Sequence, residues 1–293
     1  MRASAIFGPS SSERDLRTFR GVPQISWRIG VPASANEADV ILLFGGDGTI
    51  HRHLPHLIKL QLPVLVVPRG SGNDLARALG LRSLNDSLAV WRRFVSGAGK
   101  VGAIDIGVVR TLEQNEEHYF CTVAGVGLDG EVVRRADRLP RWLRGKGGYL
   151  LTLLPVLFRF AALSMKITMT GGAPEASLGD GFRPTILAAF ANVPTYGGGM
   201  KIAPQAQLDD GQLDICVIRD INKFKLLCLF HTVYFGRHLG ITEVEYSQAT
   251  SLQLETEYPL DVYADGEYVC QTPIEVSLKR SALRVIVSES YRK

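Results

Sequence analysis

Two glycine-rich segments, each directly after a short apolar run, constrain the fold of this chain more than any other feature. The run "DVILLF" (39–44) precedes "GGDGT" (45–49), and "LPVLVVP" (62–68) precedes "RGSGND" (69–74). A continuous apolar run is typical of a strand covered on both faces, whereas glycine is costly where a strand or helix should continue. The pattern predicts two strands that end in loops whose backbone must approach another group closely.

Helical patterns follow both loops. Apolar residues recur at helical spacing over 50–60, with Thr49 as the expected N-cap and with Pro55 expected to kink the helix or delay its start. A short helix is predicted over 74–80 and a third helix over 83–97. Alternating strands and helices favour a parallel sheet covered by helices. Both glycine loops would then lie at the carboxyl ends of strands, where such sheets bind ligands.

The second part of the chain has a different texture. From about residue 104, short apolar runs such as "LDICVIRD", "TSLQLET" and "LRVIV" alternate with turn residues, and helical patterns are confined to about 129–160 and 222–238. Short strands at this spacing indicate a mainly antiparallel domain. We therefore predict an α/β domain over 1–104 and a β-rich domain over 105–293.

Charge and cysteine content limit the function classes. A net charge of +4 over 293 residues is too small by itself to indicate a nucleic-acid-binding protein. The four cysteines form no C-x-x-C pair, and those in "DICVI", "LLCLF" and "EYVCQ" have the apolar neighbours of core cysteines. We expect a reduced, cytoplasmic protein with no disulfide framework and no nucleic-acid partner.

No segment has the pattern of a membrane-spanning helix. The most apolar stretch, "YLLTLLPVLFRFAALSM" (149–165), is interrupted by Pro155 and Arg159 and is too short to cross a bilayer. The beginning of the chain also lacks the apolar stretch of a secretory signal.

The first glycine loop carries an acid that narrows its chemistry. A glycine-rich turn between a strand and a helix presents backbone N–H groups to an anion. Asp47 would be unfavourable beside phosphates unless a cation lay between them, so "GGDGT" indicates Mg²⁺-nucleotide binding; the alternative is a plain tight turn. The chain has no G-x-x-x-x-G-K-[ST] motif, and "GVGLDG" (125–130) matches the dinucleotide fingerprint without a strand–helix unit around it.

An ordered set of motifs resembles one known family. "GGDGT", "PRGSGNDLARALG", "AIDIG", "AGVGLDGEVV", "ANVPTYGGGMKIAPQAQLDDGQLDICVI" and "YADGEY" follow one another from residue 41 onward. Together they resemble the diacylglycerol kinase catalytic-domain family, and in particular its soluble bacterial lipid kinases. The resemblance implies a nucleotide-binding α/β domain like that of NAD kinases and phosphofructokinases, followed by a mainly antiparallel, β-sandwich-like domain.

The same resemblance implies the residues of the nucleotide site. The phosphates of ATP would be held by the first loop, and the second loop would form the facing wall of the site. The implied residues are Gly45, Gly46, Asp47, Gly48 and Thr49 in the first loop and Ser71, Gly72, Asn73 and Asp74 in the second. Asp47, Asp74 and Asp105 match acidic positions that organise catalytic Mg²⁺ in the family. For Asp105 the alternative is a surface acid at a strand edge.

The "DGE" sequence at 265–267 has two interpretations that are compatible. Asp-Gly between two β-type runs is a strong signal for a type I′ hairpin turn. The resemblance adds a general base that accepts the proton of the lipid hydroxyl, for which Glu267 is the first choice. Asp265 would assist as a metal or water partner, and the division of roles between the two acids stays open. With Asp47, these residues form the expected catalytic set.

A second Mg²⁺ site is implied by "QLDDGQLD" (207–214). This stretch resembles the family's structural Mg²⁺ loop, with the Asp210 side chain and the backbone carbonyls of Gln207 and Gln212 as ligands. The alternative is an ordinary Asp-Asp-Gly turn.

Two regions bear on the nucleotide and on the membrane. Gly8 stands where the family usually has asparagine, and the stretch before "GGDGT" is short, which leaves the nucleotide preference open.

The segment 134–154 joins a basic stretch that contains Trp142 to an apolar one, a pattern that suits an anionic membrane surface. The alternative is a basic surface helix followed by a core helix.

The sequence therefore predicts an ATP- and Mg²⁺-dependent lipid kinase that phosphorylates a hydroxyl of diacylglycerol or a related lipid. It would be cytoplasmic, associated peripherally with the membrane through 134–154, and able to form a homodimer. Two alternatives stay open: a kinase for a soluble substrate, of the NAD kinase type, and a catalytically weak protein that binds nucleotide and lipid.

Overall fold

The protein divides into two compact units. A computed structural model describes residues 1–21, 24–128, 130, 160–171, 178–179, 181–289 and 291. Unit 1 comprises Met1–Ile106 and Lys279–Lys293, and unit 2 comprises Gly107–Leu278. The chain passes into unit 2 close to the predicted boundary. Its last residues, assigned to the second domain from sequence, belong instead to unit 1.

Unit 1 contains the predicted parallel sheet. The strands lie in the order β2 (Ser26–Ile29), β1 (Arg2–Phe7), β3 (Val40–Gly45), β4 (Val64–Pro68) and β15 (Ile274–Val287), and each adjacent pair is parallel. Every residue of β3 and β4 is buried, as expected for strands covered on both faces. The pairing of Val285 with Val64 brings the end of the chain back to this unit.

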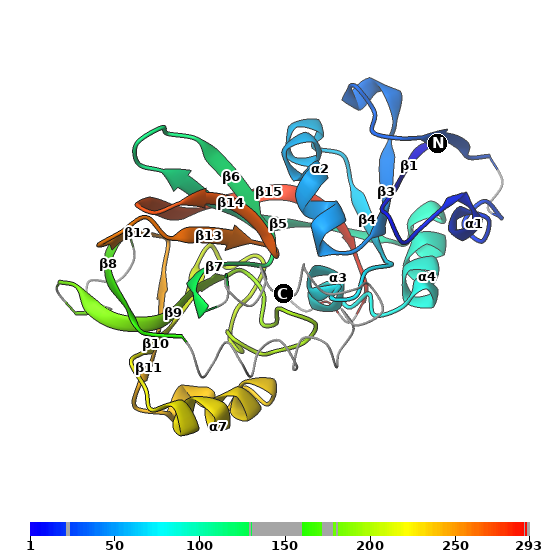
Figure 1. Ribbon diagram of the computed structural model, residues 1–293. Coiled ribbons are helices and arrows are strands. Elements are labelled where there is room, and N and C mark those ends of the chain that lie inside the picture. The colour runs from blue at the N-terminus through cyan, green and yellow to red at the C-terminus, as the bar shows by residue number, and fades with distance from the viewer. Residues whose placement is uncertain are drawn as a thin grey trace. The chain divides into compact units, whose positions relative to one another are not determined.

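Helices cover both faces of this sheet. In Figure 1, α2 (Asp47–Leu60) lies on one face and α4 (Leu84–Val95) on the other. The first crossover is reduced to α1 (Glu13–Leu16), a single turn, and β3 is preceded by η1 (Ala35–Glu37). The short stretch before "GGDGT" that was noted in the sequence therefore contains a strand, β2, but only one turn of α-helix.

The start of α2 differs from the prediction. The helix begins at Asp47 with Gly46 as the N-cap, so the assignment of Thr49 as N-cap is wrong. The amide of Thr49 already donates to the carbonyl of Gly46, at 2.9 Å, which places Thr49 inside the first turn. Pro55 lies within the helix without ending it. The glycine loop is thus directly continuous with the helix.

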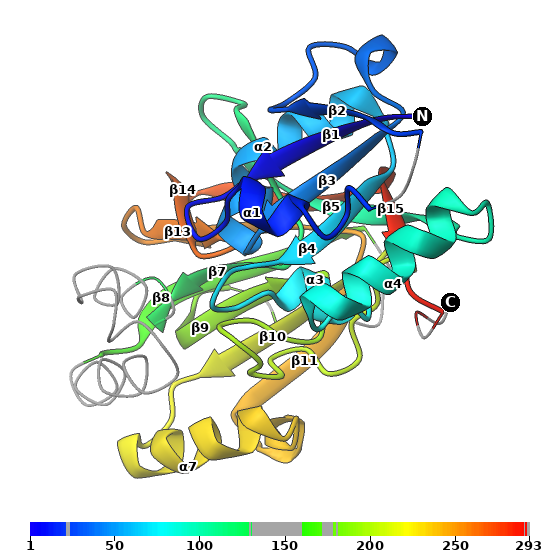
Figure 2. The ribbon, with the colours of Figure 1, turned by 90° about the vertical axis from the view of Figure 1, so that its right-hand side faces the viewer.

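Unit 2 consists of two antiparallel layers. One contains β14 (Glu267–Gln271), β13 (Asp261–Ala264), β7 (Val123–Gly127), β9 (Arg183–Ala191), β10 (Leu213–Arg219) and β11 (Val244–Ala249). The other contains β8 (Leu163–Gly171), β12 (Ser251–Thr256), β15, β5 (Lys100–Thr111) and β6 (Glu117–Phe120). Figure 2 shows β7, β9, β10 and β11 side by side.

The two layers share one apolar core. Phe120 and Leu252 of the second layer belong to the same cluster of buried side chains as Val126, Phe190 and Ile215 of the first. Buried side chains from both layers in one cluster are the packing expected of a β-sandwich, so the predicted architecture of the second domain is confirmed.

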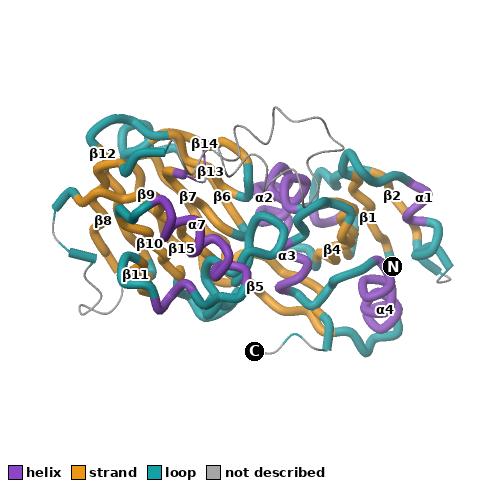
Figure 3. The backbone as a smooth tube through the Cα atoms, turned by 60° about the horizontal axis from the view of Figure 1, so that its bottom comes forward, coloured by secondary structure: helices purple, strands orange, loops and turns teal. Residues whose placement is uncertain are grey.

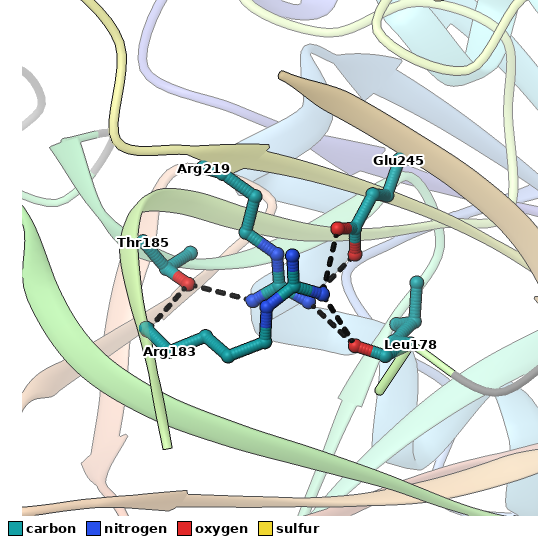
Figure 4. A network of polar contacts seen from close by, with 5 residues as sticks. All are labelled: Leu178, Arg183, Thr185, Arg219 and Glu245. Atoms are coloured by element: carbon teal, nitrogen blue, oxygen red, sulfur yellow. Dashed lines mark hydrogen bonds and ion pairs between the residues drawn. The ribbon is translucent and has the colours of Figure 1, made fainter. Parts of the chain in front are cut away.

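A partly buried ion-pair network links the ends of three strands in unit 2 (Figure 4). The guanidinium of Arg219 donates to Glu245 at 2.6 Å, to the carbonyl of Leu178 at 2.9 Å and to the hydroxyl of Thr185 at 2.8 Å. Arg183 donates to the same carbonyl and pairs with Glu245 at 2.8 Å. Although partial burial opposes ionisation, the hydrogen bonds and charges of both arginines keep the pKa of Glu245 below its ordinary value.

A helix, α7 (Lys223–Tyr234), connects β10 to β11 and is followed by η2 (His238–Gly240). Figure 3 shows the helix against the strands of unit 2. Leu226, Leu229 and Val233 are buried, whereas Cys228 is exposed. The expectation that Cys228 in "LLCLF" is a core cysteine is therefore wrong, because the helix is apolar on both sides and only one side is covered.

Among the helices within the described ranges, none combines the length and apolarity that crossing a bilayer requires. The predicted basic and apolar segment at 134–154, and nearly all of the helix expected over 129–160, fall outside the described residues.

Candidate active site

The two glycine loops of unit 1 touch each other through their backbones. A Cβ atom added at Gly46 would lie 2.7 Å from the Cα of Gly70, and one added at Gly70 would lie 2.5 Å from the Cα of Gly46. The amide of Arg69 donates to the carbonyl of Gly45 at 2.9 Å, which joins the loops at their base. The close approach predicted from the glycines is therefore, in part, an approach of one loop to the other.

Asn73 fixes the shape of the second loop. It adopts a left-handed conformation with φ of 54°, which asparagine tolerates better than most residues. Its Oδ1 accepts from the amide of Gly70 at 2.8 Å, and its Nδ2 donates to the carbonyl of Gly70 at 2.6 Å. Its amide group thus holds Gly70 against the first loop.

Asp47 joins the first loop to the helix that follows the second, α3 (Asp74–Ala78). Its Oδ2 accepts from the amide of Asp74 at 3.0 Å and its Oδ1 from the amide of Leu75 at 3.1 Å. These are N–H groups of the first turn of α3, which has no side-chain cap from its own N-cap residue. Asp47 therefore caps α3, a role that the sequence analysis missed.

Asp74 is buried and forms an ion pair with Arg77. Arg77 also donates to the carbonyl of Gly72 at 2.9 Å. Gly45 and Thr49 are buried too, whereas Gly46, Asp47, Gly48 and Gly72 are partly exposed and Ser71 is exposed. The predicted set thus divides into residues that shape the two loops and residues that reach their surface.

A steric constraint explains why position 8 is a glycine. A Cβ atom at Gly8 would lie 2.3 Å from Oγ1 of Thr49, and one at Gly45 would lie 2.5 Å from its Cβ. Thr49 occupies the space that a side chain at position 8 would need. The amide of Gly8 donates to the carbonyl of Phe44 at 2.8 Å, which keeps this turn beside the first glycine loop.

The arrangement suits phosphate groups. The fourteen-residue helix α2 starts at the surface of the first loop, and the N-terminus of a helix attracts anions through its N–H groups and its dipole. A side chain at either Gly46 or Gly70 would force the loops apart. The two loops and the start of α2 therefore meet at one place, as a phosphate cradle requires.

Asp105 is buried in unit 1 and is engaged by the backbone. Its Oδ1 accepts from the amide of Ser281 at 2.6 Å, and Ser281 has a φ of 49°. The carboxylate thus holds an irregular point of β15. The surface-acid alternative does not describe this residue, and its part in organising Mg²⁺ stays a prediction.

The "DGE" sequence forms the predicted hairpin in unit 2. Asp265 and Gly266 connect β13 to β14 with φ of 52° and 83°, and two consecutive positive values are typical of a type I′ turn. The Asp265 carboxylate accepts from the amides of Cys121 and Thr122 at 3.0 and 2.7 Å and from the hydroxyl of Thr122 at 2.5 Å. Glu267 is exposed. Asp265 therefore anchors the hairpin, and Glu267 is the more exposed of the two acids.

The segment 207–214 contains an additional buried acid, Asp214, at the start of β10. Asp210 Oδ1 accepts from the amide of Gln212 at 2.9 Å and closes the Asp-Asp-Gly turn. Asp214 is fully buried; its Oδ1 accepts from Tyr246 at 2.5 Å and from Gln248 at 3.1 Å. Its Oδ2 has no hydrogen-bond partner in the part of the chain that the structure describes.

A cation would suit this loop. Burial raises the pKa of Asp214 to about 6, although its two hydrogen bonds oppose this, and the charge of Asp210 raises it further. A buried carboxylate oxygen without a partner, beside a second acid, fits a bound cation. Within the described ranges, no three His, Cys, Asp or Glu side chains gather as a metal site, so carbonyls and water would have to complete the shell. The sequence analysis did not identify Asp214 as a candidate ligand, although it is the last residue of "QLDDGQLD" (207–214).

Two family descriptions match most of the chain. Residues 28–109 match the diacylglycerol kinase catalytic domain. Residues 122–287 match the YegS C-terminal NAD kinase beta sandwich-like domain. The two matches correspond to the α/β and β-sandwich parts described above.

Curated relatives match over most of the chain. A diacylglycerol kinase of Mycobacterium tuberculosis is 34% identical over 254 residues, which cover 87% of this chain and 78% of that protein. A diacylglycerol kinase of Bacillus subtilis is 28% identical over 245 residues, covering 83% and 76%. A protein of Chromohalobacter salexigens, described as a probable lipid kinase YegS-like, is 24% identical over 281 residues, covering 91% and 83%.

Solved structures support the fold. A Bacillus anthracis protein superposes with a TM-score of 0.76 at 20% identity and covers 99% of this chain and 98% of its own. A crystal structure described as a diacylglycerol kinase from the same organism gives a TM-score of 0.69 at 18% identity, with the same coverage.

The fold, the glycine loops and these matches define a lipid kinase. The chain belongs to the diacylglycerol kinase catalytic-domain family, with a second domain of the YegS type.

Proposed function

We propose that this protein transfers the γ-phosphoryl group of ATP, with Mg²⁺, to a hydroxyl of diacylglycerol or a related lipid. The observation that carries the proposal is the backbone contact between Gly46 and Gly70 at the start of α2. This contact presents two loops and one helix N-terminus to the same group, and a triphosphate is the anion that such a cradle suits. The names of the curated relatives support a lipid acceptor.

In the proposed reaction, the lipid hydroxyl oxygen forms a bond to the γ-phosphorus. The bond between that phosphorus and the bridging oxygen of ADP breaks, and ADP leaves. Glu267 accepts the proton of the hydroxyl as the new bond forms. Glu267 is favoured over Asp265 because it is exposed, whereas the carboxylate of Asp265 already accepts hydrogen bonds from Cys121 and Thr122.

Mg²⁺, when bound with ATP, would neutralise charge on the phosphates during transfer. Asp47 fits this role in part, because it is partly exposed and a carboxylate is a ligand type that Mg²⁺ prefers. Asp74 and Asp105 would act from buried positions. A second Mg²⁺ would lie in the loop 207–214, held by Asp210 and by the carbonyls of Gln207 and Gln212, with Asp214 beside it.

Labelled-phosphate transfer tests the proposal directly. ATP labelled at the γ position is supplied with mixed micelles that contain diacylglycerol and, in a parallel reaction, with NAD, each with Mg²⁺ and with excess chelator. Label should enter the lipid in the presence of Mg²⁺ only. Label in NAD and in no lipid would favour the alternative of a soluble-substrate kinase. ATP binding without transfer to either acceptor would favour a catalytically weak binding protein.

The place of action is part of the same proposal. A lipid acceptor is reached at a membrane surface, so we propose a cytoplasmic protein with peripheral membrane contact through 134–154. A homodimer stays a prediction. Sedimentation velocity and fractionation of cells that express the protein test these two points.

A further inference from the structure

Helix α7 of unit 2 has two apolar faces, and only one of them is covered. Leu226, Leu229 and Val233 recur at helical spacing and are buried against the unit. A helix in a globular protein normally has a polar face opposite its buried stripe. The opposite side of α7 is apolar instead, which is the unusual feature.

The uncovered side is a continuous stripe, here called the outer face. At about 100° per residue, its members fall on the side of the helix directly opposite Leu229 and Val233. Phe224 is 74% exposed and Phe235, at the C-cap, is 60% exposed. The outer face consists of Phe224, Leu227, Cys228, His231, Tyr234 and Phe235, all of which are exposed.

Two rings of the outer face contact each other, and the helix stands at an edge of the unit. The rings of His231 and Phe235 meet edge to face with centroids 5.3 Å apart. In Figure 1, α7 lies at the lower edge of unit 2, below β10 and β11. Several neighbouring large apolar residues on a single exposed helix face mark an interaction surface, whereas scattered ones need no explanation.

Basic residues border this stripe. Lys223 and Lys225 lie in the first turn of α7 on either side of Phe224, and Arg237 follows Phe235. Lys201 is exposed, and its side chain lies 3.5 Å from the Cβ position of Gly236. On the acidic side, Glu243 pairs with Lys225 at 2.6 Å, and Asp220 is exposed before the helix. The balance around the outer face is therefore basic.

We propose that the outer face of α7 docks on the surface of an anionic lipid bilayer. Phe224, Leu227 and Phe235 would enter the boundary between headgroups and acyl chains, and the basic residues would remain among the headgroups. Tyr234 has the ring with a polar tip that is enriched at this boundary. The inference deepens the proposed function, on whose lipid acceptor it rests, by adding a second membrane-facing surface to the contact proposed for 134–154.

The charge pattern favours a bilayer over a second copy of the chain. In a two-fold pairing through α7, the outer face of one copy would cover that of the other. The basic residues at both ends of the stripe would then face basic residues of the partner, which is unfavourable. Anionic headgroups supply the opposite charge to the same residues.

Vesicle sedimentation without ATP tests the proposal. The full chain is mixed with phosphatidylcholine vesicles, with or without about a third of phosphatidylglycerol, and pelleted. The wild-type protein should sediment with the anionic vesicles, and Phe224→Ser with Phe235→Ser should lower the partition coefficient at least about tenfold. Burial of a single large apolar side chain already corresponds to roughly this factor.

A matched control uses exposed aromatic residues of the same unit outside α7. Tyr258 is 76% exposed and Phe182 is 47% exposed, and Tyr258→Ser with Phe182→Ser should leave the partition coefficient unchanged. Both double variants should keep the wild-type melting temperature, since none of these side chains is buried. An equal loss of sedimentation in both double variants would overturn the proposal, because it would then reflect exposed aromatic residues in general.

Cys228 supplies a second readout. An environment-sensitive fluorophore on this exposed thiol should shift to the blue on anionic vesicles, because the label enters a less polar environment. An unshifted label together with unchanged sedimentation of the Phe224→Ser/Phe235→Ser variant would overturn the proposal. A wild-type dimer that dissociates in this variant, without any change in vesicle binding, would assign the outer face to a second copy.

The test separates this inference from the proposed function. Face-dependent vesicle binding without phosphoryl transfer to any lipid would support the docking surface and contradict the kinase reaction. Transfer to diacylglycerol in vesicles that is identical in the wild type and in the α7 variant, with equal sedimentation, would contradict the docking surface alone.

Discussion

The carboxylate of Asp47 caps the helix that begins at Asp74, with 3.0 Å between Oδ2 of Asp47 and the amide nitrogen of Asp74. One acid of the first glycine loop therefore determines where the second loop ends. Asp47 is expected both to hold the loops together and to face the nucleotide, and substitutions can separate these two roles.

Asp47→Asn should lower turnover by about 10²-fold or more and leave the protein folded. Asparagine keeps one oxygen that can accept from the amides of α3, so it should lose less stability than alanine, whereas its neutral amide cannot provide the charge that Mg²⁺ requires. Asp47→Ala should in addition lower the free energy of unfolding by about 1–2 kcal/mol, because the cap is lost. Urea unfolding and lipid phosphorylation assays measure the two effects. Normal turnover in a folded Asp47→Asn protein would contradict a metal role.

Gly70→Ala should weaken ATP binding and destabilise unit 1. The added methyl group would lie 2.5 Å from the Cα of Gly46, and overpacking of this kind typically costs about 1–3 kcal/mol. Gly21→Ala is the matched control, because its nearest contact is the carbonyl of Thr18 at 3.8 Å. Calorimetric ATP titration and thermal unfolding check both variants. Equal behaviour of the two would show that the contact between the loops is dispensable.

Substitutions of the two acids in "DGE" should have different effects, one on turnover and the other on stability. Glu267→Gln should lower turnover by about 10²- to 10⁴-fold without changing stability, as expected for an exposed general base. Asp265→Ala should destabilise the protein by about 2–4 kcal/mol, because the amides of Cys121 and Thr122 lose their acceptor. Thermal melts beside single-turnover kinetics distinguish them. If the Glu267→Gln protein has wild-type kinetics, Glu267 is not the general base and another residue must accept the proton.

Glu245→Gln should lower the free energy of unfolding by about 2–4 kcal/mol, since it leaves the buried Arg219 without its anion. The folded-state pKa of Glu245 is below its ordinary value of 4.5. Its contribution is therefore complete above that value and is lost as the pH falls through the folded-state pKa. In Glu245→Gln, the free energy of unfolding should therefore no longer show the decrease at low pH that protonation of Glu245 causes in the wild type.

A control for that measurement is Glu255→Gln, which removes an exposed pair with Lys166. Exposed pairs contribute about 0–1 kcal/mol, so the change should be small. If both variants lose the same free energy in urea titrations between pH 3 and pH 7, the network of Figure 4 has no special role.

Mg²⁺ should raise the melting temperature of the wild-type protein, because a ligand that binds only the native state stabilises it. The increase should be lost in Asp210→Ala and reduced in Asp214→Asn, which removes the buried charge but keeps the shape. Differential scanning fluorimetry with Mg²⁺, Ca²⁺ and chelator measures it. An increase that persists in Asp210→Ala would place the stabilising cation elsewhere.

The sequence by itself determined the architecture and most of the motifs. Period and composition were sufficient for β3, α2 and β4, because buried parallel strands and amphipathic helices have local signatures. The type I′ turn at Asp265 and Gly266 was equally local, since few residues tolerate two positive φ values in succession.

Only the tertiary structure decided how these parts are used. The glycines at 46 and 70 are required by each other, and Asp47 is occupied by the amides of Asp74 and Leu75, which lie 27 and 28 residues away in the chain. The exposure of Phe224 and Cys228 was likewise not predictable, because a helix with two apolar faces does not indicate which of them the sheet will cover. The hydrophobic effect is non-directional and favours burial of either apolar face equally. Which face of α7 is buried is therefore decided only when the helix packs on the strands.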